Sequence, residues 1–95
     1  MYDEILFSII DYMNEIEKTS FWNKELFEQQ VYSIWAAKEI YILLYENEDE
    51  HPAQVVKRYA KKMDEYSCRH GEKSIMFSIA HDTAIEILGI IYKAM

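Results

Sequence analysis

The chain has 95 residues, 51% of them apolar, and carries 17 Asp and Glu against 10 Lys and Arg, a formal net charge of −7. This length allows one domain over residues 1–95, and the apolar content is too high for intrinsic disorder. Because the net charge repels phosphate, it argues against direct binding of nucleic acid and for a basic protein partner.

The charges are distributed unevenly along the chain. Residues 1–50 carry twelve Asp and Glu against three Lys and Arg, whereas residues 51–73 carry six basic against three acidic residues. Residues 74–95 are nearly neutral and strongly apolar. Charge segregation of this kind indicates a surface that meets a partner of opposite sign.

Cysteine use and the N-terminal sequence bear on the compartment. Cys68 is the only cysteine, so no intramolecular disulfide can form, and a reducing compartment is favoured. The N-terminus is acidic where a secretory signal would be basic, and no apolar run approaches the ~20 residues of a membrane span. We therefore expect a cytoplasmic protein with no membrane contact.

The first predicted helix spans residues 3–18. Asp3 can serve as its N-cap, and Lys18 suits the negative end of the helix dipole. Its core stripe, at helical spacing, consists of Tyr2, Ile5, Leu6, Ile9, Tyr12, Met13 and Ile16. A polar ridge follows one edge of this helix and consists of Glu4, Ser8, Asp11 and Glu15.

The second predicted helix begins near Ser20 or Asn23, both good capping residues, and reaches Glu46. Its apolar stripe consists of Phe27, Val31, Ile34, Trp35, Tyr41, Ile42 and Tyr45, and it is widened by Leu26, Ala37, Ile40 and Leu44. A helix this apolar is expected to lie at the centre of the fold or to pack on two neighbours. Lys38 falls within the stripe, where a lysine either reaches out to the surface or meets a carboxylate of another helix.

The third and fourth predicted helices span residues 52–70 and 74–94. Pro52 follows an acidic turn and suits the first position of a helix, and Gly71 provides a C-terminal stop. The third helix is expected to bury Val56, Tyr59, Ala60 and Met63. The core face of the fourth consists of Met76, Phe77, Ile79, Ala80, Thr83, Ala84, Ile87, Leu88, Ile90 and Ile91. Two glycines and one proline leave little turn chemistry for a sheet, so we predict an all-α fold, a compact antiparallel four-helix bundle.

Two acidic motifs carry the pattern most typical of an enzyme. They read Glu-Leu-Phe-Glu over residues 25–28 and Glu-Asn-Glu-Asp over residues 46–49. This ExxE and ExxD spelling resembles the magnesium-binding signature of the all-helical nucleotide pyrophosphohydrolases of the MazG type, over these eight residues only. The resemblance implies Mg²⁺ and a nucleoside triphosphate held by Glu25, Glu28, Glu46 and Asp49.

The geometry of the predicted helix opposes that resemblance. In a continuous second helix Glu28 and Asp49 would lie ~30 Å apart and could not share a metal. The motifs would converge only if the helix broke near residues 35–38, where no residue favours a break. The alternative is that these carboxylates are solvated surface acids.

Other residues capable of catalysis or metal binding are poorly arranged for it. The zinc-capable residues Cys68, His70, His81 and Asp82 do not have the spacing of a closed site, and the sequence has no nucleophile elbow and no glycine-rich phosphate loop. We expect no enzymatic activity, no cofactor and no bound metal.

The third helix carries a basic face, formed by Arg58, Lys61, Lys62 and Arg69. Glu65 interrupts this face, and it offers no Asn or Gln that could read bases. We expect it to pair with the acidic ridge of the first helix, or with a second protomer, rather than with nucleic acid.

Two features predict interfaces. On the outer side of the fourth helix a homodimer seam is predicted from Ser78, Ile85, Gly89 and Tyr92, with contact to another helix of the same chain as the alternative. Phe21 and Trp22 predict a hydrophobic staple onto the core, with an anchor for a partner as the alternative.

These patterns favour a non-enzymatic helical binding protein that forms a homodimer. Its acidic surface would occupy a basic, nucleic-acid-binding groove on a partner protein. The acids expected to contact that partner are Asp11, Glu15, Glu46, Glu48, Asp49 and Glu50. Small acidic phage-encoded inhibitors are similar to it in size and charge alone. The alternatives are the MazG-like pyrophosphohydrolase and a structural or regulatory dimer whose charges keep it soluble.

Overall fold

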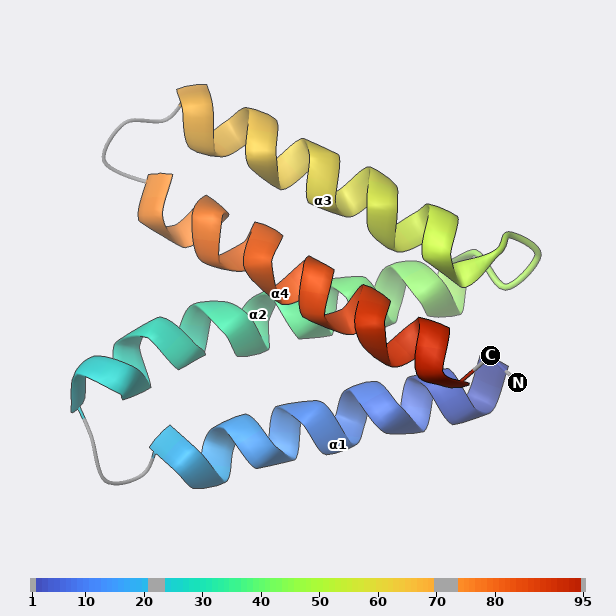
Figure 1. Ribbon diagram of the computed structural model, residues 1–95, viewed down its shortest axis with the longest axis horizontal. Helices are drawn as coiled ribbons and strands as arrows, with labels where there is room; N and C mark the ends of the chain where they lie inside the picture. Colours follow the sequence, from blue (N-terminus) through green and yellow to red (C-terminus); the bar gives the residue numbers. More distant parts are fainter. Residues whose placement is uncertain (1, 21–23, 70–73, 95) are drawn as a thin grey trace.

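Four α-helices make up the structure, a computed structural model: α1 (Tyr2–Ser20), α2 (Lys24–Glu46), α3 (Pro52–Arg69) and α4 (Ser74–Ala94). It describes residues 2–20, 24–69 and 74–94, and of residues 19, 20, 24–28 and 74 it describes the backbone alone. Consecutive helices run in opposite directions and pack into a single globule (Figure 1). The prediction of an all-α fold built from four packed helices is confirmed.

The helix ends follow the local chemistry with two exceptions. α3 begins at Pro52 and α4 spans the predicted residues 74–94. α1 begins at Tyr2, so the prediction of Asp3 as N-cap is wrong: Asp3 lies in the first turn, where its charge still favours the helix dipole. Ser20 ends α1 and does not begin α2. The predicted cap, stop and staple residues that lie outside the described part of the chain are Phe21, Trp22, Asn23 and Gly71, and the zinc-capable His70 lies outside it too.

Helix packing is centred on α4 and α2. α3 and α4 form the most extensive contact, α4 and α2 each touch all three other helices, and α1 and α3 hardly meet. The molecule measures 36 × 32 × 20 Å, so its shortest direction holds two layers of helices, each ~10 Å across with its side chains. In Figure 1 α4 lies in front of α2. Each of these two helices therefore has one face in the core and one face open to solvent.

The core contains side chains from all four helices. Its fully buried large side chains are Ile5, Ile9, Ile40, Leu44, Val56, Ile87 and Ile91. On α1 and α4 every buried residue belongs to the predicted stripe, and α3 buries Pro52, Ala53 and Val55 in addition to its predicted residues. The predicted core residues of α3 are confirmed, and the predicted stripes of α1 and α4 are confirmed in part, because their remaining members are half-buried.

The orientation of α2 corrects the prediction. Its core face consists of Ala36, Ala37, Ile40 and Leu44. Val31, Ile42 and Tyr45, which were assigned to the core stripe, are 44%, 53% and 63% exposed. Because α2 is apolar around most of its circumference, periodicity could not select the buried side. Small residues let helices approach closely, and both α2 and α4 bury alanines.

α4 also corrects the expectation about membrane segments. By length and composition Ile75–Ala94 could cross a membrane, with a mean hydropathy of 1.4, and it is the one helix of the described chain that could. This is weak evidence, because a core helix of a soluble protein passes the same test. Within the protein 33% of this segment is buried, and α4 contacts three other helices.

The two isoleucines of α2 provide a direct test of its orientation. Ile40→Ala leaves a cavity in the core and should lower the free energy of unfolding by about 2–5 kcal/mol. Ile42→Ala removes a side chain that already faces water and should change it by less than about 1 kcal/mol. Urea denaturation followed by circular dichroism measures both. Equal losses would contradict the orientation of α2.

Candidate functional site

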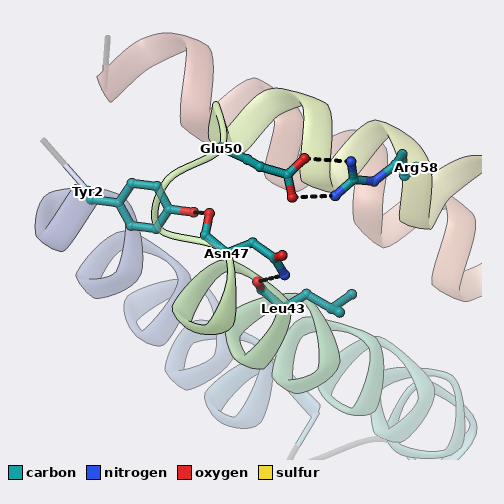
Figure 2. A network of polar contacts seen from close by, with 5 residues as sticks. All are labelled: Tyr2, Leu43, Asn47, Glu50 and Arg58. Carbon is teal, nitrogen blue, oxygen red and sulfur yellow. Dashed lines mark hydrogen bonds and ion pairs between the residues drawn. The ribbon is translucent and has the colours of Figure 1, made fainter.

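The acidic turn between α2 and α3, residues 47–51, is held at its first end by Asn47. The backbone N–H of Asn47 donates to the carbonyl oxygens of Leu43 and Leu44, at 3.1 and 3.3 Å. Its side-chain Nδ2 also donates to the Leu43 carbonyl, at 2.7 Å (Figure 2). These bonds satisfy carbonyl groups that the end of a helix leaves without partners. α2 therefore ends at a defined position.

The second end of the turn is held by His51, which caps α3. Its Nδ1 accepts a hydrogen bond from the backbone N–H of Ala53 at 3.2 Å, and its carbonyl oxygen accepts from Gln54 and Val55 at 3.0 and 3.4 Å. Within the turn, the N–H of Glu50 donates to the Asn47 carbonyl at 3.0 Å. Histidine is not among the preferred N-cap residues, which is why the sequence did not predict this role.

Tyr2 ties the beginning of α1 to this turn. Its hydroxyl donates to the carbonyl oxygen of Asn47 at 3.1 Å, across 45 residues of sequence (Figure 2). The bond brings Asp3 and Glu4, both exposed, to the same end of the bundle as the turn. Burial raises the pKa of Tyr2, and the negative charges of Glu48, Glu50 and Asp49 raise it further.

The four predicted acids at the end of α2 and in the turn differ in their surroundings. Glu46, Glu48 and Asp49 are exposed. Glu50 is half-buried and accepts two hydrogen bonds from the Arg58 guanidinium, at 2.6 and 2.8 Å (Figure 2). This contact lowers the pKa of Glu50 and raises the pKa of Arg58. Arg58 of α3 thus pairs with Glu50 of the preceding turn. This corrects the expectation that Arg58 meets the acidic ridge of the first helix.

The two predicted acids of α1 lie elsewhere. Asp11 and Glu15 are exposed, and a carboxylate oxygen of Glu15 lies 3.6 Å from Nζ of Lys18. At about 1.5 Å of rise per residue they are ~14 and ~20 Å along α1 from Tyr2. We define the acidic end by its exposed carboxylates Asp3, Glu4, Glu46, Glu48 and Asp49, and the structure does not bring Asp11 or Glu15 to it.

Whether the two acidic motifs can share a magnesium ion depends on whether α2 is continuous. This helix is unbroken from Lys24 to Glu46, so the backbones of residues 28 and 46 are ~27 Å apart. The break that convergence of the motifs requires is not present. The side chains of Glu25 and Glu28 lie outside the description. Among the His, Cys, Asp and Glu side chains that are described, no group of three could hold a metal ion.

The predicted seam of α4 is uncovered. Ser78 and Gly89 are exposed, and Ile85 is 49% exposed. Among the described residues, a Cβ atom added to Gly89 would meet nothing within 4 Å, so none of them requires a glycine there. Tyr92 is also exposed, with Nζ of Lys57 5.9 Å from its ring centre. Tyr92 therefore lies near α3, and Ser78 lines a shallow pocket with Gln29 of α2 and Ser67 of α3.

Two tyrosines make polar contacts that sequence analysis missed. The Tyr12 hydroxyl donates to the Glu86 carboxylate and joins α1 to α4. Burial, followed by this hydrogen bond, raises the pKa of Tyr12. The Tyr59 hydroxyl is buried, and this burial, followed by the negative charge of the nearby Glu39 carboxylate, raises its pKa. In the sequence both tyrosines fit the apolar stripes, which gave no signal for their hydroxyl groups.

Comparison with known proteins gives no relative. No protein-family model matches the chain, and no curated protein or solved structure matches it either. What the protein does is therefore inferred from its own surface.

Arg58→Gln tests the electrostatics of the turn. The variant loses the guanidinium that lowers the pKa of Glu50, so this pKa should rise towards its ordinary value. Because the pKa of Glu50 is lowered on folding, the contribution of the pair to stability is present near neutral pH and fades as the pH falls through that lowered value. NMR titration of the Glu50 carboxyl carbon measures the shift. Arg58→Lys keeps the charge without the two-pronged contact and should give an intermediate pKa.

Proposed function

We propose that the protein is a small, non-enzymatic helical binding protein whose acidic end docks into a cationic, nucleic-acid-binding groove of a partner protein. The observation that carries this proposal is the Tyr2–Asn47 hydrogen bond. It places the first turn of α1 beside the end of α2, so that five exposed carboxylates gather at one end of a rigid bundle. Arg58, a cation bonded to the same turn, is already engaged by Glu50.

Rigidity supports this function. The turn is hydrogen-bonded at both ends, through Asn47 and His51, so its carboxylates need little further ordering when a partner binds. Fixed carboxylates can take the places of phosphates in a groove that evolved for nucleic acid. The net charge of −7 would also speed the encounter with a cationic surface.

Self-association and cytoplasmic location belong to the same proposal. The uncovered seam of α4 supports a second copy as an additional partner, because exposed apolar side chains on a small domain gain burial by association. A phage or mobile-element inhibitor of a host nucleic-acid enzyme is the class of protein that combines these properties.

Paired charge-removing variants test the acidic end. The Glu48→Gln, Asp49→Asn protein loses two charges from the turn, and the control Asp11→Asn, Glu15→Gln loses two charges from α1. The partner is identified by affinity capture at low salt with mass spectrometry, and its binding to each purified variant is then measured over a range of salt concentrations. We expect the turn variant to bind about tenfold more weakly and the control to bind like the wild type.

Three results would contradict the proposal. Binding that does not respond to salt would exclude docking driven by charge, and equal weakening in both variants would exclude the acidic end as the contact. Release of pyrophosphate from a nucleoside triphosphate with Mg²⁺, lost in Glu28→Gln, would favour the MazG-like enzyme instead.

A further inference from the structure

The outward face of α2 carries a continuous stripe of large side chains. Its members follow one another along the sequence at intervals of four, three, four and three residues. We call this set the α2 stripe, and it consists of Val31, Trp35, Lys38, Ile42 and Tyr45. Trp35 is half-buried, and the other four are exposed. Alternating steps of four and three are the spacing of a helix that packs along a second helix. Most of this face is open to solvent in the described fold, and a single cation, Lys38, lies at its centre.

A shallow groove runs beside the α2 stripe. It has a volume of about 290 Å³ and lies between α1 and α2, lined by Ile10, Met13, Lys38, Tyr41 and Ile42. Lys38 and Ile42 belong to both the groove and the stripe. The groove therefore extends the apolar surface and leaves room for side chains of a docked helix.

The outward face of α4 carries a stripe of similar spacing, with a charge of opposite sign. Steps of three, four, three, four and three residues separate the members of the α4 stripe, which are Ile75, Ser78, Asp82, Ile85, Gly89 and Tyr92. All six are exposed. A single charge, Asp82, interrupts this stripe, and its side chain is 78% exposed with His81 3.6 Å away. Each stripe thus carries one charge, and the two charges are opposite.

We propose that the α2 stripe of one copy packs antiparallel on the α4 stripe of a second copy, with Lys38 opposite Asp82. In an antiparallel pair, moving from Lys38 towards the end of α2 corresponds to moving from Asp82 towards the beginning of α4. The intervals between stripe members are then the same on both helices, in this direction and in the opposite one. The remaining four layers of this register are Val31 with Gly89, Trp35 with Ile85, Ile42 with Ser78, and Tyr45 with Ile75. Two of these layers set a larger side chain against glycine or serine, which lets the helices approach closely.

The charges oppose the symmetric alternatives. If the α2 stripe packed on itself in register, Lys38 would meet Lys38 of the partner, and two α4 stripes would bring their Asp82 carboxylates close together. Like charges within an apolar contact oppose association, whereas the mixed pairing joins a cation to an anion. The mixed pairing also explains why each stripe tolerates one charge at its centre.

The mixed pairing produces a head-to-tail assembly. α2 and α4 contact each other, and the buried residues of each lie on the side opposite to its exposed stripe, so the two stripes face in opposite directions. One copy can therefore bind a second through its α2 stripe and a third through its α4 stripe. This assembly rests on the self-association included in the proposed function, and it does not involve the acidic end.

Variants that block one stripe at a time test the assembly. Ile42→Glu blocks the α2 stripe and Ile85→Glu blocks the α4 stripe, both at exposed positions. By sedimentation velocity of the purified proteins, the wild type should form species larger than a dimer as its concentration rises, and each variant alone should be monomeric. An equimolar mixture of the variants should give a one-to-one dimer and nothing larger. Phe7→Glu, at an exposed position of α1 outside both stripes, should associate like the wild type.

Charge reversal provides a second test. Lys38→Glu and Asp82→Lys should each lower the association constant about tenfold or more, and the double variant should recover most of the loss. A monomeric wild type at the highest soluble concentration would overturn the proposal. Dimers formed by one blocked variant alone would also overturn it, since they require a stripe that pairs with itself. The Glu48→Gln, Asp49→Asn protein should assemble normally, which separates failure here from failure of the acidic end.

Discussion

The packing of α4 against the other three helices is the contact on which this structure depends. α4 inserts Ala80, Ala84, Ile87 and Ile91 into the core, and α2 meets it with a face of equally small and apolar residues. A chain of this length fills two layers and no third, so neither helix is covered on its far side. The exposed stripes follow from that limit. The packing that buries one side of α2 and α4, and so stabilises the fold, leaves the opposite side of each helix exposed.

The sequence predicts most of the fold because its helices are long, periodic and separated by few turn residues. Helical spacing identified the buried faces of α1, α3 and α4, and Pro52 marked the beginning of α3. The stripe predicted for α2 covers more than half of its circumference, so it includes the buried Ala37, Ile40 and Leu44 as well as the exposed Val31, Ile42 and Tyr45. Hydrophobic spacing cannot choose between two sides that are both apolar. The orientation of α2 is set by how Ala36, Ala37, Ile40 and Leu44 pack against the neighbouring helices. That packing is a property of the tertiary structure.

The candidate site was predictable in its composition but not in its arrangement. The acids of the turn are evident in the sequence, and the structure gives them a common location. The bond from Tyr2 to Asn47 spans 45 residues, so no local pattern could reveal that the first turn of α1 joins them. The pairing of Arg58 with Glu50 spans only eight residues but requires the turn to fold back beside α3. The separation of Asp11 and Glu15 from the turn likewise depends on which end of α1 is tied to it.

The start of α1 and the finish of α4 lie at the same end of the bundle, next to the α2–α3 turn (Figure 1). A mechanical pull on the two ends of the chain would therefore separate α1 from α4 progressively, starting at that end. It would not shear the two helices past each other. Contacts would break one turn at a time, and the Tyr12–Glu86 bond would come under load only after the first turns had opened. Under force the bundle should therefore yield gradually.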